Sequence, residues 1–304
     1  MNKPINSDKT LLATFVILLT VFALAFGDAV IKYTSANFTL WQIFTLRSIV
    51  VLPILILVIK FQKKQFSIWP RQPGWTILRS LLLTFMWVFY YSSLPHIDLS
   101  IAAATYYTLP LFITLFAAYF IGDKISQMGW LAVFLGFIGI LLILQPDANQ
   151  FNGFALLPII SAIFYALAMI LTRTYCRNED VFVLSLWLNI TMLVIGAIFS
   201  IVLVSFPVAD RLSENYPFML SIWTSINGEA WMAIGILSIT IIIGSVGTAI
   251  AYQIGRSAVV ATFDFAYVPF AALWGFLLFQ EIPDYNSVLG AILITIAGIL
   301  SARK

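Results

Sequence analysis

Apolar stretches of about twenty residues follow one another along almost the whole chain, and polar segments separate them. A helix of that length matches the hydrocarbon core of a bilayer, which is roughly 30 Å thick. Lipid offers no hydrogen bonds, so each stretch has to satisfy its own backbone polar groups, as an α-helix does. Charged residues make up only 10% of the 304 positions, whereas a soluble domain has about a quarter. The sequence therefore predicts an all-α integral membrane protein.

Ten stretches qualify as membrane-spanning helices. They cover residues 11–33, 38–59, 75–94, 99–121, 128–145, 153–172, 181–205, 229–254, 258–279 and 287–302. An even number of spans leaves both termini on one side, and thirteen of the sixteen lysines and arginines fall on that side. Because cytoplasmic segments carry the excess of basic residues, we expect both the N- and the C-terminus to be cytoplasmic.

The second half of the chain repeats a pattern from the first half. Both copies have a tyrosine, an Ala-Thr pair, a proline, an acidic residue and a glycine-containing apolar helix that ends in Gly-Ile-Leu. The markers are Tyr91, Ala104-Thr105, Pro110 and Asp123 in the first copy, and Tyr252, Ala261-Thr262, Pro269 and Glu281 in the second. The period is about half the chain, which indicates two fused halves, residues 1–150 and 151–304, and not a solenoid.

The number of spans in each half determines how the halves are oriented. Five is an odd number, so the second half must enter the membrane with the opposite orientation to the first. Inverted repeats of this kind are typical of transporters, whose two halves build one site near the middle of the membrane. We therefore predict ten transmembrane helices as two inverted five-helix repeats around a central cavity.

The doubled pattern resembles the EamA-type members of the drug/metabolite transporter superfamily. Asp28, Lys32 and Tyr33, followed by Arg47, also resemble the first two spans of many bacterial members. The resemblance implies a ten-helix carrier of the bacterial inner membrane that moves small metabolites or drugs through a central cavity. The chain departs from the family at Asp123, where a glutamate is usual.

Charged side chains within spans are expensive and usually functional. Asp28 and Lys32 are four residues apart on one predicted helix, in the favourable order for an ion pair. Arg47, in the next span, can reach a similar depth. One hypothesis is an ion-pair network that neutralises these charges and holds the two spans together. The other is an anion or carboxylate site at Arg47, with Asp28 as a gate or proton carrier.

Asp264 lies among aromatic residues in the ninth span and should face the interior or water. It either accepts hydrogen bonds from nearby hydroxyl groups, or it binds a cationic group or a coupling proton. A carboxylate surrounded by rings suits an organic cation or a zwitterion. The predicted substrate-binding residues are Asp264, Tyr91, Tyr107, Tyr252, Phe263, Tyr267 and Trp87.

Of the prolines inside predicted spans, Pro110 in the fourth and Pro269 in the ninth belong to the repeated pattern. Each frees a backbone carbonyl, so we predict that they act as hinges. The single Cys176 excludes an intrachain disulfide. His96 is the only histidine and lies in a short turn, where proton sensing is an alternative to simple solvation.

These features predict a secondary transporter that moves a small amino-acid-like, cationic or zwitterionic solute by alternating access. A broad-specificity exporter of drugs or toxic metabolites is the alternative. No P-loop motif is present, and a membrane enzyme is disfavoured because no GxGD motif or catalytic His or Cys cluster occurs. No cofactor, metal or nucleic-acid partner is expected. The partners are the solute, the lipid bilayer and a coupling proton or exchanged solute, and we expect a functional monomer.

Overall fold

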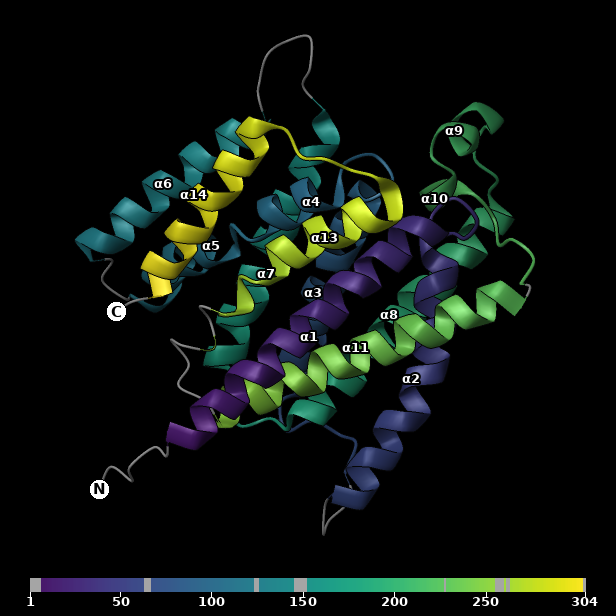
Figure 1. The fold of residues 1–304 in the computed structure, drawn as a ribbon. Coiled ribbons are helices and arrows are strands. Elements are labelled where there is room, and N and C mark those ends of the chain that lie inside the picture. Colours follow the sequence, from purple (N-terminus) through teal and green to yellow (C-terminus); the bar gives the residue numbers. More distant parts are fainter. Residues whose placement is uncertain are drawn as a thin grey trace. The chain divides into compact units, whose positions relative to one another are not determined.

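The computed structural model describes residues 7–62, 67–122, 126–144, 152–226, 228–254, 260 and 263–302, and these residues contain helices but no strand (Figure 1). The helices are α1 (Ser7–Thr34), α2 (Leu40–Gln62), α3 (Pro73–Ser93), α4 (Leu99–Tyr106), α5 (Leu109–Phe116), α6 (Gln127–Leu144), α7 (Leu157–Thr174), α8 (Val181–Ser205), α9 (Asp210–Asn215), α10 (Pro217–Leu220), α11 (Gly228–Ile254), α13 (Tyr267–Phe279) and α14 (Tyr285–Ala302).

Within the described ranges, seven helical segments are long and apolar enough to cross a membrane. They are Leu11–Thr34, Leu40–Phe61, Leu99–Phe120, Gln127–Leu144, Gly153–Thr172, Val181–Ser205 and Ala230–Thr248. α13 and the apolar part of α14 are shorter. The 13 residues of α13 rise only about 20 Å at 1.5 Å per residue. The prediction of a helical multi-pass membrane protein is therefore confirmed, while the ten-span count and the inverted repeats stay predictions.

The fourth and ninth predicted spans are interrupted where we expected continuous helices. The fourth consists of α4, α5 and a π-helical turn at Ala117–Ile121, with the break at Tyr107 and Thr108. Residues 263 and 264 are helical, and a turn at 265–266 separates them from α13. Each proline follows directly, Pro110 as the second residue of α5 and Pro269 as the third of α13. A proline is tolerated in the first turn, where the N–H has no helical partner.

The helices form two compact units, and each draws on both halves of the sequence. The first unit contains Met1–Ala29, Ile97–Leu156 and Thr240–Lys304, and the second contains Val30–His96 and Leu157–Ile239. α1 and α11 contribute residues to both. The units are defined by contacts and the predicted halves by sequence, so the division at residue 150 stays a prediction.

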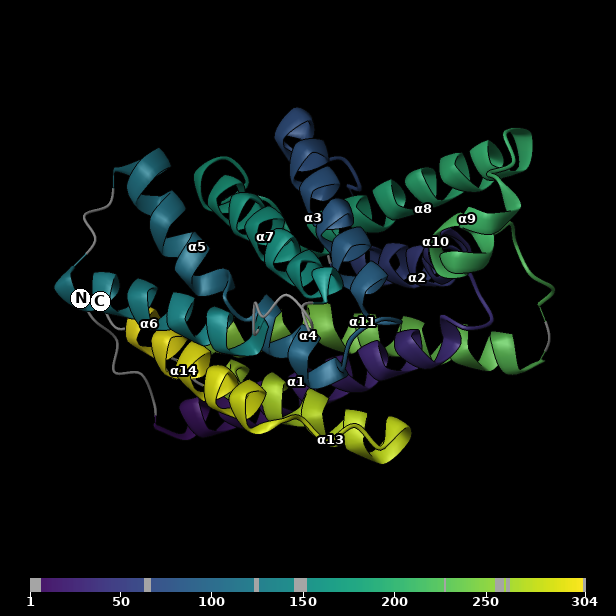
Figure 2. The same ribbon diagram turned by 90° about the horizontal axis from the view of Figure 1, so that it is seen from above.

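In the first unit, α14 packs along α6, and α13 and α14 both contact α4. Both views show α6 and α14 side by side (Figures 1 and 2). Glycines allow this close approach, because a Cβ atom on Gly290 would lie 2.6 Å from the carbonyl oxygen of Gly139. Small residues at helix contacts are typical of membrane proteins.

In the second unit, α2 packs on α8, and α3 packs on α7 and α8. Gly196 of α8 faces α2, where a Cβ atom would lie 2.9 Å from the carbonyl oxygen of Trp41. The Trp41 ring stacks on Phe199 at 4.1 Å between ring centroids. Asp180 caps the start of α8 by accepting a hydrogen bond from the Phe182 amide at 2.9 Å. These contacts hold α2 and α3 against the second half of the sequence.

Candidate functional site

Tyr107, at the interruption between α4 and α5, joins the two broken helices of the first unit. Its hydroxyl donates a hydrogen bond to the backbone oxygen of Asp264, 3.2 Å away. Its ring stacks on Tyr267 at 5.1 Å and meets the edge of Phe265 at 5.3 Å. Helix breaks leave backbone oxygens without helical donors, and the Tyr107 hydroxyl satisfies one of them.

Asp28 belongs to the same cluster. Its side chain is 4% exposed, and Oδ2 accepts a hydrogen bond from the hydroxyl of Tyr267. Tyr267 is itself buried and begins α13. The structure thus brings together an acid from α1, a tyrosine from the α4–α5 break and a tyrosine from α13. We call Asp28, Tyr107 and Tyr267, with the Asp264 backbone, the acidic cluster.

Asp264 and Phe263 precede the second interruption. The Asp264 side chain is partly buried, and Phe263 is 39% exposed while Tyr267 is buried. In one continuous helix Phe263 and Tyr267, four residues apart, would lie on the same face. The turn at 265–266 breaks that spacing. Tyr252 lies in α11, and its side chain is outside the described residues.

The second unit holds a separate cluster around Arg47, which is 1% exposed. One terminal nitrogen donates to the Tyr91 hydroxyl at 3.4 Å, and the other to the Met192 sulfur at 3.1 Å. The guanidinium lies 5.6 Å from the Phe44 ring centroid. Trp87 packs on Tyr91 at 4.8 Å between ring centroids. We call Arg47, Tyr91, Trp87, Phe44 and Met192 the arginine cluster.

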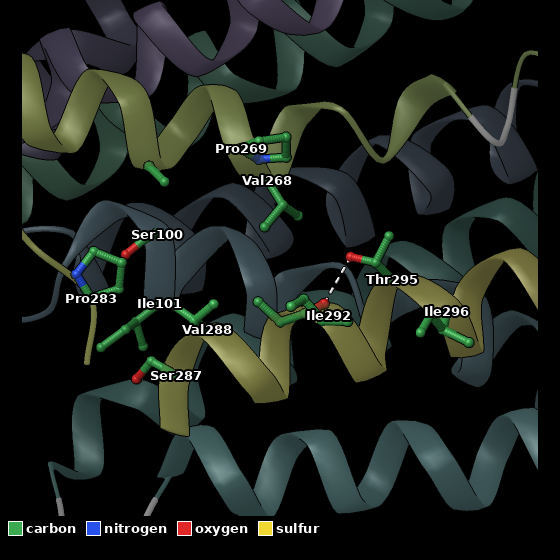
Figure 3. A pocket seen from close by; sticks show the side chains of 12 residues that line it. Ser100, Ile101, Val268, Pro269, Pro283, Ser287, Val288, Ile292, Thr295 and Ile296 are labelled. Atoms are coloured by element: carbon green, nitrogen blue, oxygen red, sulfur yellow. Dashed lines mark hydrogen bonds between the residues drawn. The ribbon is translucent and has the colours of Figure 1, made fainter. Parts of the chain in front are cut away.

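A cavity of about 340 Å³ lies between α4, α13 and α14 in the first unit. Figure 3 shows Ser100 and Pro283 toward one end and Ile296 at the other. Its lining is almost entirely apolar, yet the hydroxyls of Ser100 and Ser287 are buried there without a hydrogen-bond partner. A wider cavity of about 640 Å³ in the second unit is lined by residues near the end of α1 and the start of α11.

Comparisons with known proteins show which transporters the chain resembles. Residues 11–145 match the EamA-like transporter family. The S-adenosylmethionine uptake transporter of Rickettsia felis is 25% identical over 100% of this chain and 97% of its own length. These matches support the assignment of the chain to the drug/metabolite transporter superfamily.

Other named relatives are about as similar to the chain. The pseudopaline exporter of Pseudomonas aeruginosa is 24% identical over 94% of both chains. The riboflavin transporter of Vibrio cholerae is 25% identical over 90% of this chain and 87% of its own. A crystal structure of a protein with 17% sequence identity covers 98% of this chain and 97% of its own, with a TM-score of 0.62. The relatives from Rickettsia felis, Pseudomonas aeruginosa and Vibrio cholerae carry the names of transporters.

The predicted substrate-binding residues fall into two groups. Asp264, Tyr107 and Tyr267 lie in the first unit, and Tyr91 and Trp87 lie in the second. Asp28 is in the first unit, and Lys32 and Arg47 are in the second, so a network of the three stays a prediction. Sequence reasoning did not pair Asp28 with Tyr267, because no spacing rule connects α1 with α13.

Two side chains outside the predicted spans, Cys176 and His96, have shifted pKa values. Burial raises the pKa of the Cys176 thiol, although a contact with Thr76 and the nearby Arg79 oppose the shift. A raised pKa keeps the thiol protonated and unreactive. Burial lowers the pKa of His96, whose ring lies 6.1 Å from that of Tyr216. Among the described residues, no group of His, Cys, Asp and Glu could hold a metal.

Proposed function

We propose that the chain is a secondary transporter that moves a small amino-acid-like, cationic or zwitterionic solute across the bacterial inner membrane by alternating access. The observation that carries the proposal is the buried carboxylate of Asp28, which Tyr267 bonds beside two helix interruptions. Interrupted helices and intramembrane acids are typical of solute and ion sites in secondary transporters. Relatives named for S-adenosylmethionine and riboflavin support a small organic solute.

Helix pairing supports the proposal of ten spans in two inverted repeats. Within the first unit, the predicted fourth and ninth spans pair as α4 with α13, and the fifth and tenth pair as α6 with α14. Within the second unit, the second and seventh spans pair as α2 with α8. A two-fold axis brings equivalent elements together in this way. Residues 107–108 and 265–266, where the helices break, also stand at equivalent places before Pro110 and Pro269.

The two prolines and the acidic cluster suggest how access alternates. Pro110 and Pro269 each start a helix segment after a break, and we propose these breaks as the hinges. Tyr107 and Tyr267 link the segments to each other and to Asp28. A shift of either segment would change the hydrogen bond that Asp28 accepts, which suits a coupling proton or a solute cation.

Asp264 is proposed as a second acidic group for the solute. A charge-assisted hydrogen bond contributes roughly 1.5–3 kcal/mol, so Asp264→Asn should weaken binding of a cationic solute about 10- to 100-fold. Asp210→Asn, in the exposed helix α9, is the matched control. If Asp264→Asn changes neither the affinity for the cationic solute nor the pH dependence of transport, the role of Asp264 is structural.

Counterflow in proteoliposomes tests the proposed function directly. Purified protein is reconstituted and loaded with unlabelled S-adenosylmethionine or riboflavin, and uptake of the labelled compound is measured. A carrier gives saturable uptake that unlabelled solute on the opposite side accelerates, whereas a channel does not. If neither solute shows counterflow, the assay is repeated with labelled L-amino acids, and failure with all of them contradicts the proposal.

The second candidate function is a broad-specificity exporter of drugs or toxic metabolites. The relative named as a pseudopaline exporter favours export. The breadth of competition separates the candidates. A metabolite carrier is inhibited by a few related solutes, whereas a drug exporter is inhibited by unrelated hydrophobic cations at similar concentrations.

A further inference from the structure

Arg47 is buried among acceptors that carry no charge. Its terminal nitrogens reach a phenolic oxygen and a thioether sulfur, and its Nε has no hydrogen-bond partner. Within the described part of its unit, the guanidinium meets no carboxylate. The Tyr91 contact is long, at 3.4 Å, and a thioether is a weak acceptor. Five N–H donors are therefore served by two weak bonds and the face of Phe44.

A buried cation in this state is expensive. Burial of a charge without an opposite charge is strongly unfavourable, and the cost falls when a carboxylate arrives. The planar guanidinium matches a carboxylate in two parallel hydrogen bonds, which a lysine cannot reproduce. Such an unsatisfied group is what a solute-binding site shows before the solute is bound.

Two further unsatisfied groups lie on the same pair of helices. Ser48 follows Arg47 on α2, and its buried hydroxyl has no hydrogen-bond partner. Asn189 lies one turn from Met192 on α8, and its Oδ1 is also buried without a partner, while its nitrogen bonds the Ser185 carbonyl at 2.9 Å. An amide oxygen accepts a hydrogen bond from an ammonium group. Besides Arg47, the α2–α8 pair thus carries a buried hydroxyl and a buried amide oxygen without hydrogen-bond partners.

We propose that Arg47 binds the carboxylate of the transported solute, so that the substrate class is carboxylate-bearing and of the amino-acid type. The inference rests on the proposed function and adds the chemical group that the second unit recognises. The rings of Tyr91 and Trp87 pack on each other, with Tyr91 in contact with Arg47, and aromatic rings of this kind can contact the apolar part of a solute.

The first test needs no ligand. Arg47→Met removes the charge and keeps an apolar chain of similar length, and the melting temperature is measured in detergent. If Arg47 awaits a solute, the variant should melt at the wild-type temperature or roughly 2–4 °C above it. If Arg47 belongs to a structural ion-pair network, the variant should melt several degrees lower or fail to fold, and that result would overturn the proposal.

The second test asks which group Arg47 recognises. Free L-amino acids and their methyl esters are compared as probes, because the ester removes only the negative charge. Free acids should raise the wild-type melting temperature more than their esters, and Arg47→Met should abolish the difference. Arg47→Lys should melt at about the wild-type temperature and should lose most of the preference for free acids over methyl esters. Arg79→Met is the matched control. Arg79 lies in the same unit, its Nε bonds Thr172, and one of its terminal nitrogens is buried without a partner, as Nε of Arg47 is. If the preference belongs to Arg47 and not to any buried arginine, Arg79→Met should keep it.

Three results count against the inference. The first is that a free amino acid and its methyl ester raise the melting temperature equally. The second is that no free amino acid raises it. The third is that Arg47→Met still responds more to the free acid than to the ester. Counterflow reports the proposed function separately. If counterflow is saturable and Arg47→Met does not change it, the carrier function is supported and the proposed role of Arg47 is contradicted. If the melting temperature shifts in an Arg47-dependent way but no counterflow is seen, the carboxylate site is supported and the carrier function is contradicted.

Discussion

The contact between α6 and α14 offers a sharp test of the fold, because two glycines face each other there. A Cβ atom on Gly290 would lie 2.6 Å from the backbone oxygen of Gly139 and 2.6 Å from Cγ1 of Ile143. Ordinary contacts of a Cβ atom begin at 3.4 Å. In Gly290→Ala the helices must therefore separate by roughly 0.8 Å, since the backbone oxygen cannot rotate away.

The expected magnitude follows from two opposing terms. Alanine is favoured over glycine in a helix by up to about 1 kcal/mol. Overpacking a tight contact costs about 1–3 kcal/mol. We expect the second term to exceed the first and to lower stability by about 1–2 kcal/mol, which corresponds to a melting temperature roughly 2–8 °C lower.

The assay is thermal unfolding in detergent, with Gly235→Ala as the matched control. Gly235 lies within α11, and a Cβ atom there would meet nothing within 4 Å. Because alanine has a higher helix propensity than glycine, Gly235→Ala should melt at or slightly above the wild-type temperature. If Gly290→Ala behaves like Gly235→Ala, then α6 and α14 do not approach as closely as we describe.

Two further predictions concern the acidic cluster and the turn before α4. Tyr267→Phe removes the hydroxyl that donates to Asp28, and we expect proteoliposome uptake to fall about 10-fold or more, because hydrogen bonds to charged groups contribute roughly 1.5–3 kcal/mol. Tyr107→Phe removes a bond to a neutral backbone oxygen and should lower uptake less, so an equal loss in both variants would contradict the role of Asp28. Because the pKa of His96 is lowered in the folded protein, the unfolded chain binds its proton first, and stability should fall as the pH drops below about 6.5. His96→Gln should flatten that pH dependence of the melting temperature, and an unchanged profile would show that other groups cause it.

The sequence determined the class of protein and the positions of most helices. The span predicted at 128–145 is α6 at Gln127–Leu144, and the span predicted at 181–205 is α8 with the same bounds. These predictions succeed because the length and hydropathy of a membrane helix are local properties, fixed by the bilayer and by the need to satisfy the backbone. The repeated markers also indicated the superfamily, which the comparisons confirmed.

Only the tertiary structure decided which of these residues meet. The hydrogen bond from Tyr267 to Asp28 joins residues 239 positions apart, and no periodicity within a helix encodes such a pair. The breaks at 107–108 and 265–266 were likewise visible only in the structure, because a proline permits an interruption without specifying its exact position. The sequence analysis placed Tyr91 and Tyr107 in one predicted binding site, whereas the contacts between helices assign them to different units. Long-range packing decides such partners, since many arrangements of apolar helices satisfy the same hydropathy pattern.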